Sequence, residues 1–176
     1  MNEKPLRLAA LGLLAILYAG SAAAYRHLPE RIPVHFDLAG NADSWASTSL
    51  LSWFMLPLIA TALAGFTLAI GRLSEYRPEL WNVPEKPRFL ALPSDARAPI
   101  VARLRAFMAL MAVMTTALMG VIQAEVFLPS TGQARATPWL IAGAVVLMLM
   151  VTGVAAVRMN GRVAAEIREA HRRLHG

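Results

Sequence analysis

Four long apolar runs, separated by polar connections, dominate the pattern of hydrophobic and polar positions along this chain of 176 residues. They occupy residues 6–25, 50–73, 104–128 and 138–157. Each run is close to the roughly 20 residues that an α-helix needs to cross a hydrocarbon core of about 30 Å. From Ile141 to Val157 the only hydrogen-bonding side chain is Thr152, whereas a soluble bundle helix would carry polar residues along its outer face. The pattern therefore predicts an all-α integral membrane protein of four transmembrane helices, forming one domain over residues 1–176.

Composition agrees with this class, since 57% of the residues are hydrophobic and 16% are charged. The chain has no cysteine, which excludes disulfides, thiol catalysis and thiolate metal sites. The net charge of +6 does not require a nucleic-acid partner, because membrane proteins retain Lys and Arg on the cytoplasmic side. With both termini in the cytoplasm, 14 of the 17 basic residues lie inside and 3 lie outside. This bias predicts an outer loop over 26–49 and a proline-rich cytoplasmic loop from Arg72 to Arg103.

The first run leaves one alternative open. Lys4 and Arg7, the apolar stretch that follows and the small residues 21–24 also fit a cleavable signal peptide. The apolar stretch is longer than a signal peptide needs, so we expect a retained first span. The next loop is outside in either case.

The tail over 158–176 is predicted to be a basic amphipathic helix. Val163, Ile167, Ala170 and Leu174 follow helical spacing, with arginines around the rest of the circumference. Such a helix suits the anionic inner surface of a membrane.

The outer loop carries too many structure-forming residues to be a plain linker. Pro29 and Pro33 prevent the first helix from continuing. Apolar residues alternate over 32–36, which predicts a short extended segment, and residues 39–42 have the composition of a turn. Trp45 is expected at the membrane surface, where tryptophan is enriched. These features predict an ordered loop.

Four residues of this loop are candidate ligand-binding residues: His35, Asp37, Asn41 and Asp43. Two hypotheses remain open for them. Carboxylates and an imidazole can hold a cation or a ligand, but the spacing matches neither a calcium loop nor a zinc signature, so we assign no metal. Alternatively, Asp and Asn bond the backbone of a turn, and Asp43 or Ser44 caps the helix that follows.

Glu125 is a further candidate, because it lies near the outer end of the third run. An ionisable residue inside a span is a functional candidate by default. Glu125 is therefore expected to act either as an interfacial cap or in ligand contact. The centres of all four runs lack ionisable residues, which argues against ion-coupled transport.

The loop also resembles a known family. Its motif consists of Leu28-Pro29, Ile32-Pro33, His35-Phe36, Gly40 and Asp43, and a second stretch has Asn82, Pro84 and Lys86 before Phe89-Leu90. Both resemble the bacterial membrane domain of unknown function in the SdpI-type family, named after immunity proteins against a sporulation-delaying toxin. The resemblance implies the bacterial inner membrane as location. It also implies structural roles for Pro29, Pro33, Phe36, Gly40, Trp45, Asn82, Pro84 and Lys86.

The function expected from these features is non-enzymatic binding, as immunity or sensing, of a peptide or lipid-like ligand at the outer membrane surface. The expected partners are the lipid bilayer and either a peptide ligand or another membrane protein, and no cofactor is expected. Two alternatives stay open: a small transporter or membrane enzyme that uses His35 and Asp43, and an accessory subunit of a larger membrane complex.

Overall fold

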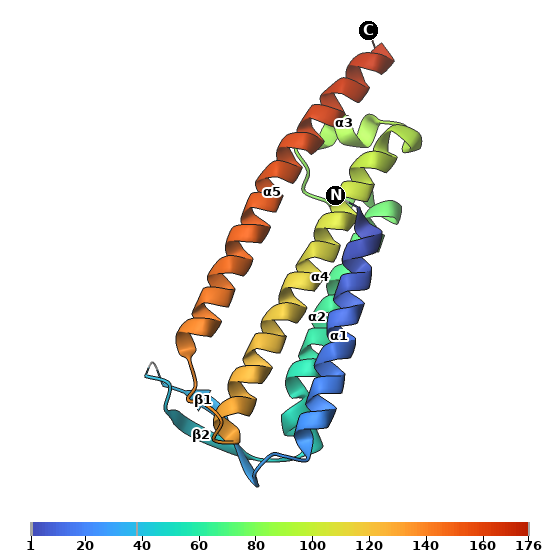
Figure 1. Cartoon of the computed structure of the whole chain (residues 1–176). Coiled ribbons are helices and arrows are strands. Elements are labelled where there is room, and N and C mark those ends of the chain that lie inside the picture. Colours follow the sequence, from blue (N-terminus) through green and yellow to red (C-terminus); the bar gives the residue numbers. More distant parts are fainter. Residues whose placement is uncertain (1, 38, 176) are drawn as a thin grey trace.

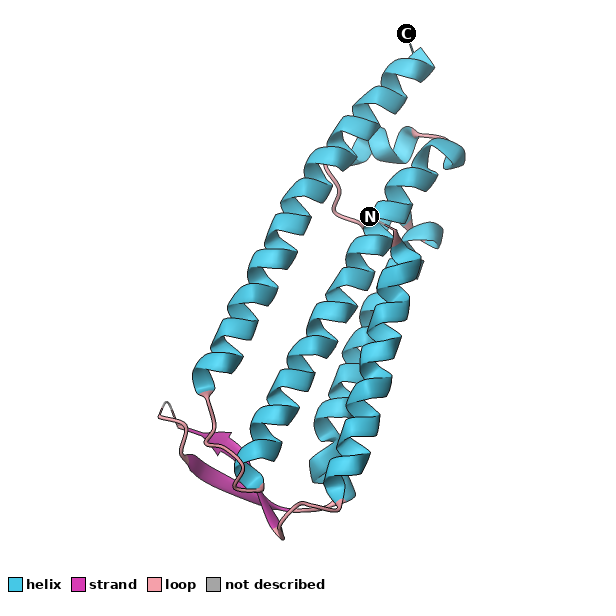
Figure 2. Ribbon diagram, viewed as in Figure 1, coloured by secondary structure: helices cyan, strands magenta, loops and turns pink. Residues whose placement is uncertain are grey.

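The computed structural model describes residues 2–37 and 39–175, and it is 77% helical. Four long helices run side by side, and a two-stranded hairpin lies across one end of them (Figure 1, Figure 2). The elements are α1 (Glu3–Tyr25), β1 (Arg31–Phe36), β2 (Ala42–Ser47), α2 (Leu50–Tyr76), η1 (Pro78–Leu80), α3 (Lys86–Ala91), α4 (Ser94–Ser130) and α5 (Pro138–His175).

The helices α1, α2, α4 and α5 are each long and apolar enough to cross a membrane, so the chain is a multi-pass membrane protein. Each expected span lies inside one of them, but α4 begins well before residue 104 and α5 continues well past residue 157. The apolar runs are shorter than the helices because hydropathy measures the hydrocarbon-facing part alone, whereas the helices continue into polar sequence beyond it.

Helix α4 lies in the middle of the bundle and packs against α1, α2 and α5 (Figure 1). Ala10, Ala64 and Ala112 are fully or almost fully buried where α1, α2 and α4 meet. Small side chains at such contacts allow helix backbones to approach closely in a membrane. Much of the remaining apolar surface faces outward, as on α5, where Trp139 is 76% exposed. Outward apolar side chains are what a lipid-facing helix requires.

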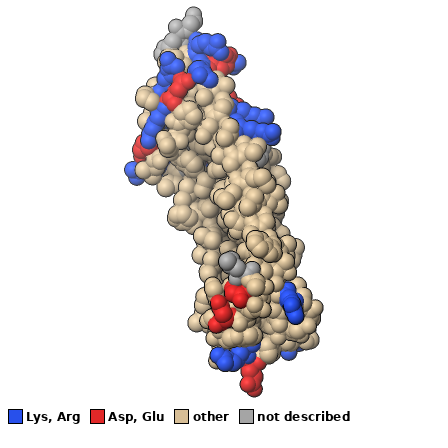
Figure 3. All heavy atoms as spheres, turned by 90° about the vertical axis from the view of Figure 1, so that its left-hand side faces the viewer, with Lys and Arg blue, Asp and Glu red and all other residues tan. Residues whose placement is uncertain are grey.

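The two ends of the bundle differ in charge. We call the end that carries β1 and β2 the hairpin end, and the opposite end, which carries α3, both chain termini and the last turns of α5, the arginine-rich end (Figure 1). Figure 3 shows Lys and Arg gathered mainly at the arginine-rich end, with an uncharged band between the two ends. Such a band is expected where a bilayer surrounds the protein.

A small apolar core fixes α3 and the last part of α5 at the arginine-rich end. It contains Val83, Phe89, Leu92, Ile100, Leu104, Val163 and Ile167. The tail is therefore helical, as predicted, but Val163 and Ile167 are buried against protein, not laid on a bilayer. The prediction failed on this point because an apolar stripe does not reveal whether lipid or another helix covers it.

The all-α class holds for the bundle but is incomplete at the hairpin end. There β1 pairs with β2 in antiparallel register, with Arg31 opposite Ser47 and His35 opposite Ser44. The extended segment over 32–36 was expected, whereas β2 was not. Asp43 and Ser44 resembled helix caps, yet both lie in β2, and α2 is capped by Ser49 in a capping box with Ser52.

Candidate functional site

The hairpin is closed at its base by backbone pairing that the two prolines permit. Pro29 and Pro33 cannot continue α1, so the chain leaves the helix and extends. The amide of Thr48 donates to the Glu30 carbonyl at 2.9 Å, and its hydroxyl donates to the Pro29 carbonyl at 2.6 Å. These contacts bring the start of α2 back beside the end of α1 and hold the two strands between them.

One side of β1 anchors the hairpin on the bundle. Ile32 and Pro33 are buried, and β1 packs against α4. Phe36 is half-buried, while Pro29 is exposed and contributes its carbonyl to the base of the hairpin. Pro33, Ile32 and Phe36 therefore belong to the structural part of the motif.

Asp37 and Asn41 form the turn between the strands. The Asp37 carboxylate accepts hydrogen bonds from the backbone N–H of Ala39 at 2.9 Å and of Asn41 at 2.8 Å, and from the Asn41 side-chain amide at 3.0 Å. The Asn41 side chain and these amides stabilise the charged form, which lowers the pKa of Asp37 below its ordinary value. This geometry supports the turn hypothesis for both residues.

Gly40 and Glu125 dock the turn on the connection between α4 and α5. Gly40 has φ +85°, and a Cβ atom at this position would lie 2.5 Å from the carbonyl oxygen of Ala136. Glu125 is 5% exposed, and its Oε2 accepts a hydrogen bond from the Thr137 amide at 2.5 Å. Glu125 thus holds the segment on which the turn rests, which favours its role as a cap over ligand contact.

His35 and Asp43 form an exposed pair across the two strands. Nδ1 of His35 lies 2.6 Å from Oδ1 of Asp43, and the side chains are 68% and 49% exposed. Val34 and Trp45, in the same two strands, are also exposed, at 53% and 46%. Of the four loop candidates, these two are the ones that the turn does not use.

An apolar groove at the hairpin end was not predicted. It has a volume of about 550 Å³ and lies between α1, Trp53 of α2 and α4. Trp53 donates its indole N–H to the Ser21 carbonyl at 2.8 Å, and the Gln123 amide donates to the Trp53 carbonyl at 3.3 Å. Gln123 and Ser21 are polar residues within apolar runs, which is the one sequence signal that pointed to this region.

The second motif stretch lies away from the hairpin. Asn82 and Pro84 lead into α3, which begins at Lys86, at the arginine-rich end (Figure 1). Val83 and Phe89 of this stretch are buried in the core around α3. The structure thus places the two motif stretches at opposite ends of the bundle, where they cannot form one site.

Comparison with protein families gives one match. Residues 12–61 match the family model described as a domain of unknown function, DUF1648. The matched segment begins in α1, contains the whole hairpin and ends in α2. No curated protein and no solved structure matches the chain. The family match therefore rests on the hairpin and the two helices that carry it.

Proposed function

We propose that this chain is a non-enzymatic binding protein of the bacterial inner membrane, whose hairpin recognises a peptide or lipid-like ligand at the outer surface. The observation that carries the proposal is the exposed His35–Asp43 pair. Its two side chains contact each other at 2.6 Å and are exposed, whereas the turn and the buried side of β1 hold the hairpin in place. A polar pair that contributes little to packing is free to serve recognition.

The chemistry of the pair suits a ligand with both polar and apolar parts. Nδ1 of His35 is engaged by Asp43, so Nε2 and the second carboxylate oxygen are left to face a ligand. Val34 and Trp45 add apolar contact area within the same two strands. Membrane-active peptides and lipid headgroups present this combination of groups at a membrane surface.

The location of the hairpin follows from the charge distribution. Basic residues concentrate at the end opposite the hairpin, and such residues are retained in the cytoplasm. The hairpin then faces outward, where an external ligand first meets the cell. The resemblance of its motif to the SdpI-type immunity proteins supports a protective or sensing role.

The test is a deletion strain complemented with variants of the pair. We expect deletion to change the sensitivity of the cells to envelope-active peptides, and wild type to restore it. His35→Ala should fail to restore it, while its protein level and melting temperature stay near those of wild type. Ser44→Ala is the matched control, because Ser44 is exposed and lies opposite His35 in the hairpin.

Two results would count against the proposal. A deletion strain with unchanged sensitivity to all the peptides removes the proposed role. Loss of abundance in His35→Ala, in parallel with loss of protection, shows that the pair is scaffold, because a structural contact costs about 0.5–1.5 kcal/mol of stability when it is removed.

A further inference from the structure

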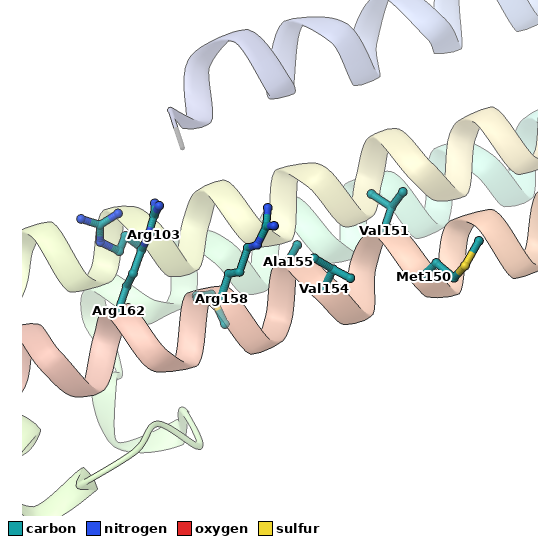
Figure 4. A pocket seen from close by; sticks show the side chains of 8 residues that line it. Arg103, Met150, Val151, Val154, Ala155, Arg158 and Arg162 are labelled. Atoms are coloured by element: carbon teal, nitrogen blue, oxygen red, sulfur yellow. The ribbon is translucent and has the colours of Figure 1, made fainter.

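A second pocket, at the arginine-rich end, combines an apolar wall with guanidinium groups. It lies between α4 and α5 and has a volume of about 500 Å³. The segment of α5 between Met150 and Met159 forms the apolar wall, and Arg103, Arg158 and Arg162 line the charged part. Figure 4 shows Arg158 and Arg162 extending from α5 toward α4, where Arg103 lies.

The wall and the arginines lie on one face of α5. Val151, Ala155, Arg158 and Arg162 are spaced by four, three and four residues, which places them along a single helical stripe. The stripe changes from apolar to cationic between Ala155 and Arg158. The pocket therefore crosses from a zone suited to acyl chains into a zone suited to anionic headgroups.

The arginines of this pocket differ in their partners. Arg103 donates from Nε to the two carboxylate oxygens of Glu166 at 2.8 Å and 3.0 Å. Arg158 and Arg162 are exposed, and neither forms an ion pair with an acidic residue in the described part of the chain. Later arginines of α5 are paired: Arg168 with Glu85, and Arg172 and Arg173 with Glu169. Two uncompensated cations thus share one pocket.

We propose that this pocket binds an anionic membrane phospholipid, with the headgroup phosphate between Arg158 and Arg162 and one acyl chain along the apolar wall. The planar guanidinium matches phosphate oxygens in bidentate geometry, and basic pockets between membrane helices bind anionic headgroups. A free phosphate would leave the apolar wall uncovered. A second copy of this chain would bring the same uncompensated arginines against each other.

Glu166 limits the extent of the site. Its carboxylate is held by Arg103, so this arginine closes the pocket and contributes little free charge to it. The site lies at the opposite end of the bundle from the hairpin, and it is independent of the function proposed there.

The experiment uses the full chain in a neutral detergent. Native mass spectrometry measures the affinity of the first bound lipid for phosphatidylglycerol and for phosphatidylcholine with identical acyl chains. We expect phosphatidylglycerol to bind more tightly. The double variant R158Q/R162Q should lose about tenfold or more of this preference, since each arginine near an anionic surface contributes a several-fold factor.

The matched control is R172Q/R173Q, which removes two charges from the same helix outside the pocket. It should keep the preference of wild type. Equal loss in both double variants would overturn the proposal, because attraction would then depend on net charge alone. Equal binding of the two lipids to wild type, or displacement of the lipid by millimolar inorganic phosphate, would overturn it as well. Unchanged helical circular dichroism in both variants verifies that each folds.

Discussion

At the scale of single residues, the hairpin divides its polar side chains between construction and presentation. Asp37 and Asn41 bond the turn, and Glu125 bonds the connection on which the turn rests. His35 and Asp43 bond each other and remain exposed. From the sequence, all five were equivalent candidates, because a list of polar residues does not show which backbone groups need partners. The structure separates them by identifying those groups.

Gly40→Ala should destabilise the protein, because the residue has φ +85° and an added Cβ would meet the Ala136 carbonyl oxygen. We expect a loss of about 1–3 kcal/mol from backbone strain, with further loss if the connection must move. Thermal unfolding in detergent measures it. Gly143→Ala is the control, since a Cβ there meets nothing within 4 Å. A melting temperature for Gly40→Ala equal to that of Gly143→Ala would show that the turn does not rest on the connection.

At the scale of elements, local patterns predicted the helices well and the pairing of elements poorly. The four spans followed from the length of the apolar runs, and the extended segment over 32–36 followed from its alternation. The strand β2 was missed because Asp43 and Ser44 also suit a helix cap, and pairing with β1 depends on residues eight or more positions away. The apolar groove depends on which helix faces meet, which no local pattern records.

The core around α3 gives a prediction at this scale. Phe89 is fully buried between α3, α4 and α5, so Phe89→Ala should cost about 3–5 kcal/mol by loss of contacts and creation of a cavity. We expect the last turns of α5 to detach and trypsin to cleave after Arg168 and Arg172 faster than in wild type. Leu90→Ala, at a position 38% exposed on the same helix, serves as the control. Cleavage of Phe89→Ala at the wild-type rate would mean that α3 does not hold the tail.

At the scale of the whole molecule, one division of labour connects the observations. A bundle of four membrane-crossing helices separates an arginine-rich end, with its own core and lipid pocket, from a hairpin end that carries the family-matched segment. The proposed function depends on the hairpin facing outward. This orientation rests on charge bias, and it is the claim on which the account as a whole depends.

Cysteine labelling on intact cells tests that claim most directly, since the natural chain has no cysteine of its own. Single cysteines are placed at exposed positions, with Ser47→Cys and Gln133→Cys at the hairpin end and Ser94→Cys and Ala165→Cys at the arginine-rich end. A membrane-impermeant thiol reagent should label the first two in intact cells and the last two only after the cells are opened. Labelling of Ser94→Cys and Ala165→Cys in intact cells, with Ser47→Cys and Gln133→Cys protected, would place the hairpin in the cytoplasm and contradict the account.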